Sequence, residues 1–174
     1  MPTLIELKDG VCKGVEDSFT HVADDAEIPG GDVILSLTRF QAEGDRMLSE
    51  GRRVGVVLQP NEEVEALAYD LPRLSVAGLV ALAFPKYRDG RAYTNARILS
   101  ERFKFKGQIR AVGDVLREQA GFMARCGFNA FEPADDASAN EWQAATHRYR
   151  HVYQRSSDAR AAAFAERAFA EREA

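Results

Sequence analysis

The sequence has 174 residues, of which 45% are hydrophobic and 29% charged, with a formal net charge of −4. This length suits one compact domain, and it excludes a complete eight-unit β/α barrel of about 250 residues. No stretch approaches the roughly 20 apolar residues that cross a bilayer, and residues 1–6 lack a signal-peptide pattern. We therefore expect a cytoplasmic protein with no membrane partner, whose two cysteines, Cys12 and Cys126, are reduced thiols.

The N-terminal part predicts a hairpin followed by a connector. Two apolar runs at residues 4–7 and 11–15 flank Asp9-Gly10, a pair that favours the positive φ angles of a tight hairpin turn. Acidic sequence of low periodicity follows and ends at Gly30-Gly31. We assign residues 1–31 to an acidic hairpin and connector.

From residue 32, short apolar runs alternate with helical patterns. The runs typical of strands are residues 33–37, 53–58, 77–84, 108–112 and 129–131. Residues 77–84 have no polar face and should form a central strand. Five strand-then-helix steps with short crossovers predict an α/β domain at residues 32–153 with a mostly parallel sheet in three layers, helices covering both faces. An open partial β/α barrel is the alternative.

The C-terminal residues 154–174 predict a helix. Ala161, Phe164, Ala165, Ala168 and Phe169 recur at helical spacing and give it one apolar side. This side either docks on its own domain or joins two copies in a homo-oligomer.

The charge is unevenly distributed along the chain. Residues 1–32 hold eight acidic residues against two lysines, whereas residues 86–110 hold eight lysines and arginines against Asp89 and Glu101. The basic segment predicts a small anion or an acidic protein as partner. Nucleic acid is not expected, because aromatic residues do not interleave with the basic ones. The alternative is a solvated helix face whose charges pair locally.

Ligands of parallel α/β sheets bind at the carboxyl ends of the strands. The polar residues predicted there are Gln59, Asn61, residues 86–91, Gly113, Asp114 and Glu132. Arginine is the side chain that holds an oxyanion in a bidentate manner, so the basic loop and helix form the predicted ligand-binding surface. Its residues are Arg88, Asp89, Arg91, Tyr93, Arg97, Arg102 and Arg110. The alternative has Asp89 capping the helix and the arginines paired with Glu101 or Asp114.

Catalytic signals are weak. Asp114 is a candidate acid or base beside Arg110, although an aspartate after a strand is most often a helix N-cap. His147 and His151 have the i, i+4 spacing of metal ligands, yet there is no H-E-x-x-H and no third ligand, so no metal is expected. No Walker, dinucleotide-binding or hydrolase motif is present, and we expect no cofactor.

Several motifs resemble a known family. Residues 84–97 (FPKYRDGRAYTNAR), Arg102, residues 107–116 (GQIRAVGDVL) and residues 126–131 (CGFNAF) are similar to the bacterial family called domain of unknown function 934. The resemblance spans roughly residues 30–132. Thr94 stands where that family usually has Ser, and Ser100 where it often has Arg, which removes one cation from the predicted surface.

Members of that family are commonly encoded beside assimilatory sulfite reductase, and some carry the label oxidoreductase. The resemblance therefore implies a link to sulfur assimilation. Together with the basic surface, it leads us to expect a non-catalytic accessory protein of sulfite or sulfate assimilation that binds an anionic ligand or an acidic partner, such as sulfite reductase or its electron donor. The alternative is an enzyme of the same pathway, oxidoreductase-like, that acts on a sulfated or phosphorylated small molecule. The shared motifs fall on the two loops selected by charge and topology, which favours Asp89, Arg91, Tyr93, Arg97, Arg110 and Asp114 as a functional surface.

Overall fold

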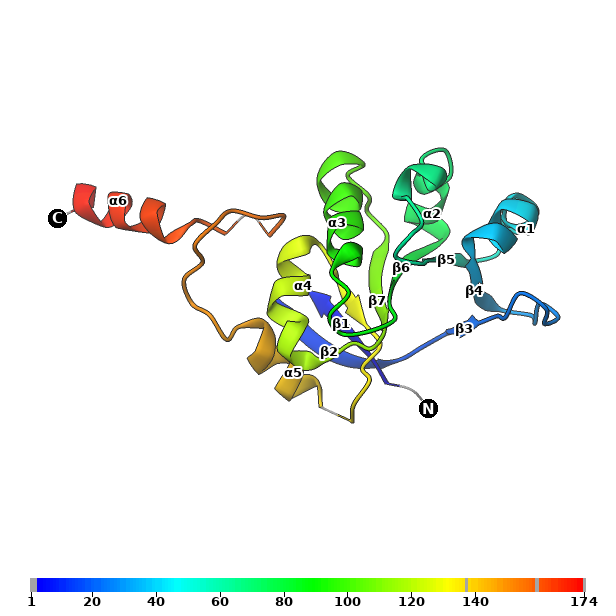
Figure 1. The fold of residues 1–174 in the computed structure, drawn as a ribbon, viewed down its shortest axis with the longest axis horizontal. Helices are drawn as coiled ribbons and strands as arrows, with labels where there is room; N and C mark the ends of the chain where they lie inside the picture. The colour runs from blue at the N-terminus through cyan, green and yellow to red at the C-terminus, as the bar shows by residue number, and fades with distance from the viewer. Residues whose placement is uncertain (1–2, 137, 159, 174) are drawn as a thin grey trace.

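A computed structural model of the protein describes residues 3–136, 138–158 and 160–173 (Figure 1). The strands are β1 (Thr3–Lys8), β2 (Val11–Glu16), β3 (Phe19–His21), β4 (Asp32–Ser36), β5 (Val54–Leu58), β6 (Gly78–Phe84), β7 (Gln108–Gly113) and β8 (Ala130–Phe131). The α-helices are α1 (Leu37–Ser49), α2 (Leu71–Ala77), α3 (Arg91–Arg97), α4 (Ala120–Cys126), α5 (Ala139–Thr146) and α6 (Ala163–Glu173). Short helical segments are η1 (Val64–Leu67), η2 (Ile98–Arg102), which is a π-helical turn, and η3 (Arg117–Gln119).

The described strands form one curled sheet in the order β2-β1-β8-β7-β6-β5-β4-β3. From β3 to β8 every neighbouring pair is parallel, whereas β1 is antiparallel to both β2 and β8. Because these six parallel strands follow one another in sequence, crossovers of one hand place their helices on one side of the sheet. The half-barrel alternative fits this arrangement. The predicted α/β class is confirmed. The predicted mostly parallel sheet in three layers is confirmed only in part, because β1 is antiparallel to both of its neighbours and the crossover helices lie on one side of the curled sheet.

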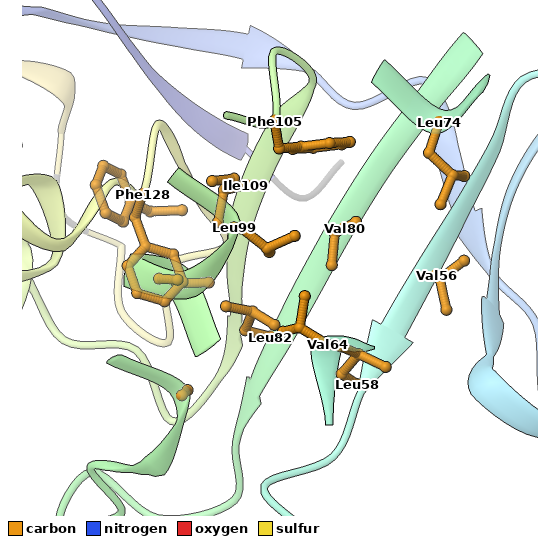
Figure 2. Packing of buried hydrophobic residues seen from close by; sticks show 14 of the residues in the cluster. Val56, Leu58, Val64, Leu74, Val80, Leu82, Leu99, Phe105, Ile109 and Phe128 are labelled. Atoms are coloured by element: carbon orange, nitrogen blue, oxygen red, sulfur yellow. The ribbon is translucent and has the colours of Figure 1, made fainter. Parts of the chain in front are cut away.

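Alternating side chains of the strands divide the apolar core between two faces. On the outer face, which α1 to α4 cover, Val56, Val80 and Leu82 pack with Leu74, Leu99 and Phe105 (Figure 2). On the inner face a smaller cluster contains Ile34, Leu79, Ala81, Ala83 and Val112. Residues 77–84 are apolar throughout because β6 is buried on both faces, as the sequence predicts for a central strand.

The link between β2 and β3 explains why the sheet is curled. These strands are the two edges of the sheet, yet only Asp17 and Ser18 separate them. Three peptide steps span at most about 11 Å, so the end of β2 and the start of β3 lie within this distance, which requires the sheet to curl. Phe19 then packs on the inner apolar cluster. The three-residue strand β3 lies in the segment predicted as a connector. The sequence does not predict it as a strand, because three residues are too few to show an alternation of apolar and polar side chains.

Other local predictions are confirmed or corrected. The hairpin forms, with Asp9 at φ 51° and Gly10 at φ 78°. Asp114 is not a helix N-cap, because the helical segment that follows β7 begins at η3, whose N-cap is Leu116. Between β5 and β6 the chain forms the short segment η1, and α2 begins beyond it, with Pro72 in its first turn.

The C-terminal region also differs from the prediction. Helix α5 ends at Thr146, so His147 and His151 do not share a helix face. Residues 154–162 precede the C-terminal helix, which spans only Ala163–Glu173 within the described residues. Among the described helices, none is sufficiently long and apolar to cross a bilayer.

Candidate functional site

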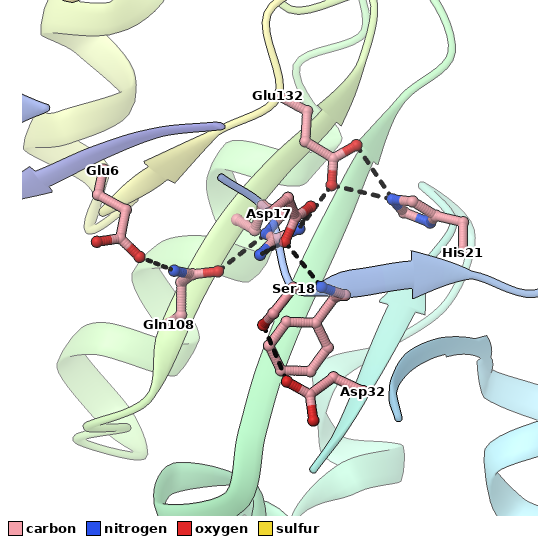
Figure 3. A network of polar contacts seen from close by, with 9 residues as sticks. Glu6, Asp17, Ser18, His21, Asp32, Gln108 and Glu132 are labelled. Carbon is pink, nitrogen blue, oxygen red and sulfur yellow. Dashed lines mark hydrogen bonds and ion pairs between the residues drawn. The ribbon is translucent and has the colours of Figure 1, made fainter. Parts of the chain in front are cut away.

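A polar network that includes Asp17, Gln108 and Glu132 lies on the inner face of the sheet (Figure 3). A buried arginine, Arg110, forms hydrogen bonds with all three. In β7, Ile109 and Ala111 face the helices, so Arg110 between them faces the inside, where its side chain is 1% exposed. Its Nη1 donates to Asp17 Oδ2 at 2.6 Å and to Glu132 Oε1 at 2.9 Å. Its Nη2 donates to Asp17 Oδ1 at 3.1 Å.

The third nitrogen of the Arg110 guanidinium also donates a hydrogen bond. Its Nε donates to Gln108 Oε1 at 2.9 Å, and Gln108 in turn donates to Glu6 Oε1 at 2.9 Å. The ring of Phe19 lies 5.5 Å from the guanidinium carbon. Burying a cation is costly unless it is paired and hydrogen-bonded, and here two carboxylates meet this requirement. Arg110 therefore holds the β2–β3 link, through Asp17, against the inner face of the sheet.

Glu132 connects this buried arginine to the solvent. Its Oε1 accepts a hydrogen bond from Arg110 Nη1, and its two carboxylate oxygens lie 2.9 and 3.0 Å from His21 Nε2. Burial raises the pKa of Glu132, but the hydrogen bonds and charges of His21 and Arg110 outweigh it and leave the pKa lowered. The side chains of His21 and Glu132 are 46% and 27% exposed. A carboxylate that orients a solvent-accessible imidazole is an arrangement suited to proton transfer.

This pair lies where parallel α/β sheets bind ligands. His21 is the last residue of β3, level with Ile34 in the middle of β4, and Glu132 directly follows β8, so both lie at the carboxyl ends of their own strands. Ser36 ends β4 at the same edge, donates to Asp24 Oδ1 at 2.5 Å and accepts from the amide of Arg39 at 3.2 Å. The carboxyl edge is thus polar above an apolar inner cluster.

The predicted basic surface is placed elsewhere, on the outside of the sheet. Within it, Arg91 pairs with Asp89 (Nη2–Oδ2 2.7 Å) and Arg97 pairs with Glu101 (3.1 Å). Arg102 pairs with Glu65 at 2.7 Å. These helix arginines are therefore each engaged by a carboxylate, and Arg110 faces away from them on the inner side. Asp89 also accepts from the amide of Arg91 at 3.2 Å, which fixes the start of α3.

Tyr93, another predicted ligand residue, lies in an aromatic cluster. Its ring centroid is 5.2 Å from that of Phe84 and 4.7 Å from that of Phe122. Burial raises the pKa of its hydroxyl to about 12. The ring packs α3 against α4, and its hydroxyl stays protonated near neutral pH.

Asp114 holds the loop that enters α3. Its Oδ2 accepts from the amide of Tyr87 at 2.8 Å, and Gln119 Nε2 donates to the carbonyl of Tyr87 at 2.8 Å. We call residues 86–88 the docking loop. Its members Lys86, Tyr87 and Arg88 are exposed, and within the described part of the chain neither cation forms an ion pair.

A sequence family described as "Bacterial protein of unknown function (DUF934)" matches residues 55–164. The chain belongs to this family. The DUF934 match contains the docking loop, Arg110 and Glu132, and begins after Asp17 and His21. None of the functionally curated proteins is significantly similar to this DUF934 chain in sequence.

Sequence reasoning found Arg110, Asp114 and Glu132 in this DUF934 protein but missed Asp17 and His21. Both lie in the acidic segment interpreted as a connector, and nothing in its pattern shows that it crosses the half-barrel. The only available signal was a histidine in an otherwise acidic stretch.

Proposed function

We propose that the protein is a cytoplasmic, non-catalytic accessory protein of sulfite or sulfate assimilation that docks on an acidic partner, sulfite reductase or its electron donor. The observation that supports this proposal is the docking loop. It presents an exposed tyrosine, 51% accessible, between two cations that have no acidic partner among the described residues. The link to sulfur assimilation rests on the family resemblance.

The loop is suited to protein recognition because its backbone is fixed before any partner arrives. Asp114 and Gln119 hold the amide and carbonyl of Tyr87, and the Asp89 amide donates to the Lys86 carbonyl at 2.8 Å. A fixed loop loses little conformational entropy on binding. Tyrosine and arginine are the residues enriched at interface hot spots, and unpaired cations steer an acidic surface toward them.

Direct binding to purified sulfite reductase, and separately to its electron donor, tests this proposal. The variant Lys86→Glu/Arg88→Glu should bind at least about tenfold more weakly than the wild type, with a smaller dependence on salt. The matched control is Lys104→Glu/Lys106→Glu, which changes two exposed cations between η2 and β7, at the opposite end of the sheet. Equal losses in both variants, or no binding of the wild type to either protein, would contradict the proposal.

The alternative, an enzyme of the same pathway, is favoured by a different observation. His21 and Glu132 form an accessible, hydrogen-bonded pair at the carboxyl edge of the sheet. In this reading His21 transfers a proton to or from a sulfated or phosphorylated small molecule, and Glu132 orients the imidazole.

Thermal unfolding with sulfite, sulfate, adenylylated sulfate nucleotides, flavins and nicotinamide cofactors tests this alternative. Stabilisation by one compound that is lost in His21→Gln, with His147→Gln as the matched control, would favour the enzyme. No stabilisation by any of these compounds would leave the docking proposal as the better one.

A further inference from the structure

The C-terminal helix stands apart from the rest of the molecule. Figure 1 shows α6 extending away from the sheet and its helices at the end of a long connection. It has 11 residues, and Phe164 in its first turn is 68% exposed. A helix of this length is marginal in water when nothing packs against it. Helix α6 therefore requires a surface to cover it.

The chain immediately before α6 is held against the rest of its own domain. Ser157 donates its amide to the carbonyl of Arg125 at 3.0 Å, and Arg125 Nε pairs with Asp158 at 3.0 Å. Ala162 is fully buried and bridges to Val152, whose carbonyl accepts from the amide of Ala163 at 2.8 Å. The helix consequently starts at a defined point and leads outward.

An aromatic groove lies beside the start of α6, between α4 and the segment that follows α5. Its volume is about 290 Å³, and Val152 forms part of its wall. Three large exposed side chains line it, namely Phe122 (57%), Tyr149 (69%) and Tyr153 (85%). We call it the arm groove. Exposed aromatic side chains gathered around one depression are typical of a protein interface.

We infer that the arm groove receives α6 of a second copy of this chain, and that two copies exchange their C-terminal helices. The helix is about 16 Å long and begins at the rim of its own groove, so it reaches beyond its own domain. Because each helix starts at the rim of its own groove, a twofold axis beside this rim would place the helix of each copy in the groove of the other. Phe164 would then lie against Phe122 and Tyr153 of the partner.

Part of the charge of the groove and helix is paired within one chain. Arg125 pairs with Asp158, and Glu166 of α6 pairs with His151 on the wall of its own groove at 2.6 Å. The groove still contains Arg148 and Arg160 against Glu118, and the sequence of α6 contains three glutamates against two arginines. The exposed aromatic side chains of helix and groove are therefore the main ground for a second copy, and the net charges of the two are of opposite sign. The inference does not depend on the proposed docking of sulfite reductase, which uses a different loop.

The test is the mass of the full-length protein in solution, measured by sedimentation equilibrium over a range of concentrations. We expect a dimer that Phe164→Asp converts to a monomer. Tyr69→Asp, at a residue that is 86% exposed and outside the groove, should leave the dimer intact. Circular dichroism of both variants should show an unchanged melting of the main domain, because Phe164 and Tyr69 are exposed.

A cross-linking experiment identifies the surface itself. In Phe122→Cys/Phe164→Cys, oxidation should give a covalent dimer, whereas Tyr69→Cys/Phe164→Cys should stay monomeric on a denaturing gel. The two natural cysteines are buried and should not interfere. A wild-type protein that is monomeric at every concentration would overturn the inference. A dimer unaffected by Phe164→Asp and not cross-linked through position 122 would do the same.

Discussion

Arg110 of β7 and Asp17 of the β2–β3 link form a bidentate ion pair across the inside of the half-barrel, with Nη1–Oδ2 and Nη2–Oδ1 distances of 2.6 and 3.1 Å. Their side chains are 1% and 9% exposed. The pair joins the segment that connects the two edges of the sheet to a strand in its middle. The curl of the sheet is therefore coupled to one buried charge.

Removing one partner of this pair should be strongly destabilising. In Asp17→Ala the guanidinium of Arg110 keeps Glu132 but loses two hydrogen bonds, and a buried charge left partly uncompensated costs about 3–5 kcal/mol. Urea denaturation measures the loss. The matched control is Arg91→Ala, which removes the exposed partner of a bidentate pair with Asp89, keeps the Arg91 amide bond to Asp89, and should leave the stability nearly unchanged. Equal effects of the two substitutions would argue against a special role for the buried pair.

The lowered pKa of Glu132 predicts how stability depends on pH. A carboxyl group whose folded pKa lies below its unfolded value stabilises the protein above the unfolded value and loses this contribution as pH falls through the folded value. The ordinary glutamate value is 4.5, so the contribution of Glu132 should decline below about pH 5.

The comparison of wild type with Glu132→Gln isolates this effect. The wild type should be the more stable protein at neutral pH, and the difference in unfolding free energy should shrink as the solution is acidified. Glu63→Gln, at a glutamate exposed and outside the network, provides the control and should show no such convergence. A difference that stays constant with pH would contradict an ionised, paired Glu132.

Close packing between β5 and β6 predicts a third effect. A Cβ atom at Gly78 would lie 1.7 Å from the carbonyl oxygen of Val54, so Gly78→Ala must push the two strands apart. We expect a loss of about 3 kcal/mol, as for other overpacked core positions. At Gly30 nothing lies within 4 Å of a Cβ atom, so Gly30→Ala should be neutral or slightly stabilising. Thermal unfolding of both variants distinguishes a steric cause from a general intolerance of alanine.

Predictions that depend on local pattern agree with the structure. Asp9-Gly10 forms the hairpin turn, and residues 77–84 form a strand buried on both faces, because a turn conformation and an apolar run are properties of neighbouring residues. The curl of the sheet is not local. It depends on Asp17 meeting Arg110, which lies 93 positions away in the sequence, and no periodicity encodes such a contact.

In the candidate site, too, the features set by neighbouring residues are predicted and those set by distant contacts are not. The rule that ligands bind at the carboxyl ends of parallel strands selected Glu132 and Asp114 without any knowledge of the contacts. The charge pattern of residues 86–110 groups Arg110 with Arg91 and Arg97, because distance along the chain does not reveal that a strand turns one side chain to the inner face while the helix beside it faces outward. His21 was missed because its strand has only three residues.

The docking loop yields the last prediction, which separates its shape from its charge. The amide of Tyr87 donates to Asp114 Oδ2 at 2.8 Å, and this bond should slow its exchange with solvent deuterium. In Asp114→Ala the bond is lost while Lys86, Tyr87 and Arg88 remain. We expect faster exchange at Tyr87 and weaker binding of sulfite reductase or its electron donor, because a mobile loop loses more entropy on binding.

Gln119→Ala is the companion variant, since it releases the carbonyl of Tyr87 and leaves its amide bond in place. It should weaken binding while changing the exchange of the Tyr87 amide less than Asp114→Ala does. If Asp114→Ala accelerates exchange but leaves affinity unchanged, the loop recognises its partner through charge alone and its fixed backbone has no role. If affinity falls in both variants while the Lys86→Glu/Arg88→Glu variant still binds as the wild type does, the partner contacts the backbone and Tyr87 rather than the two cations.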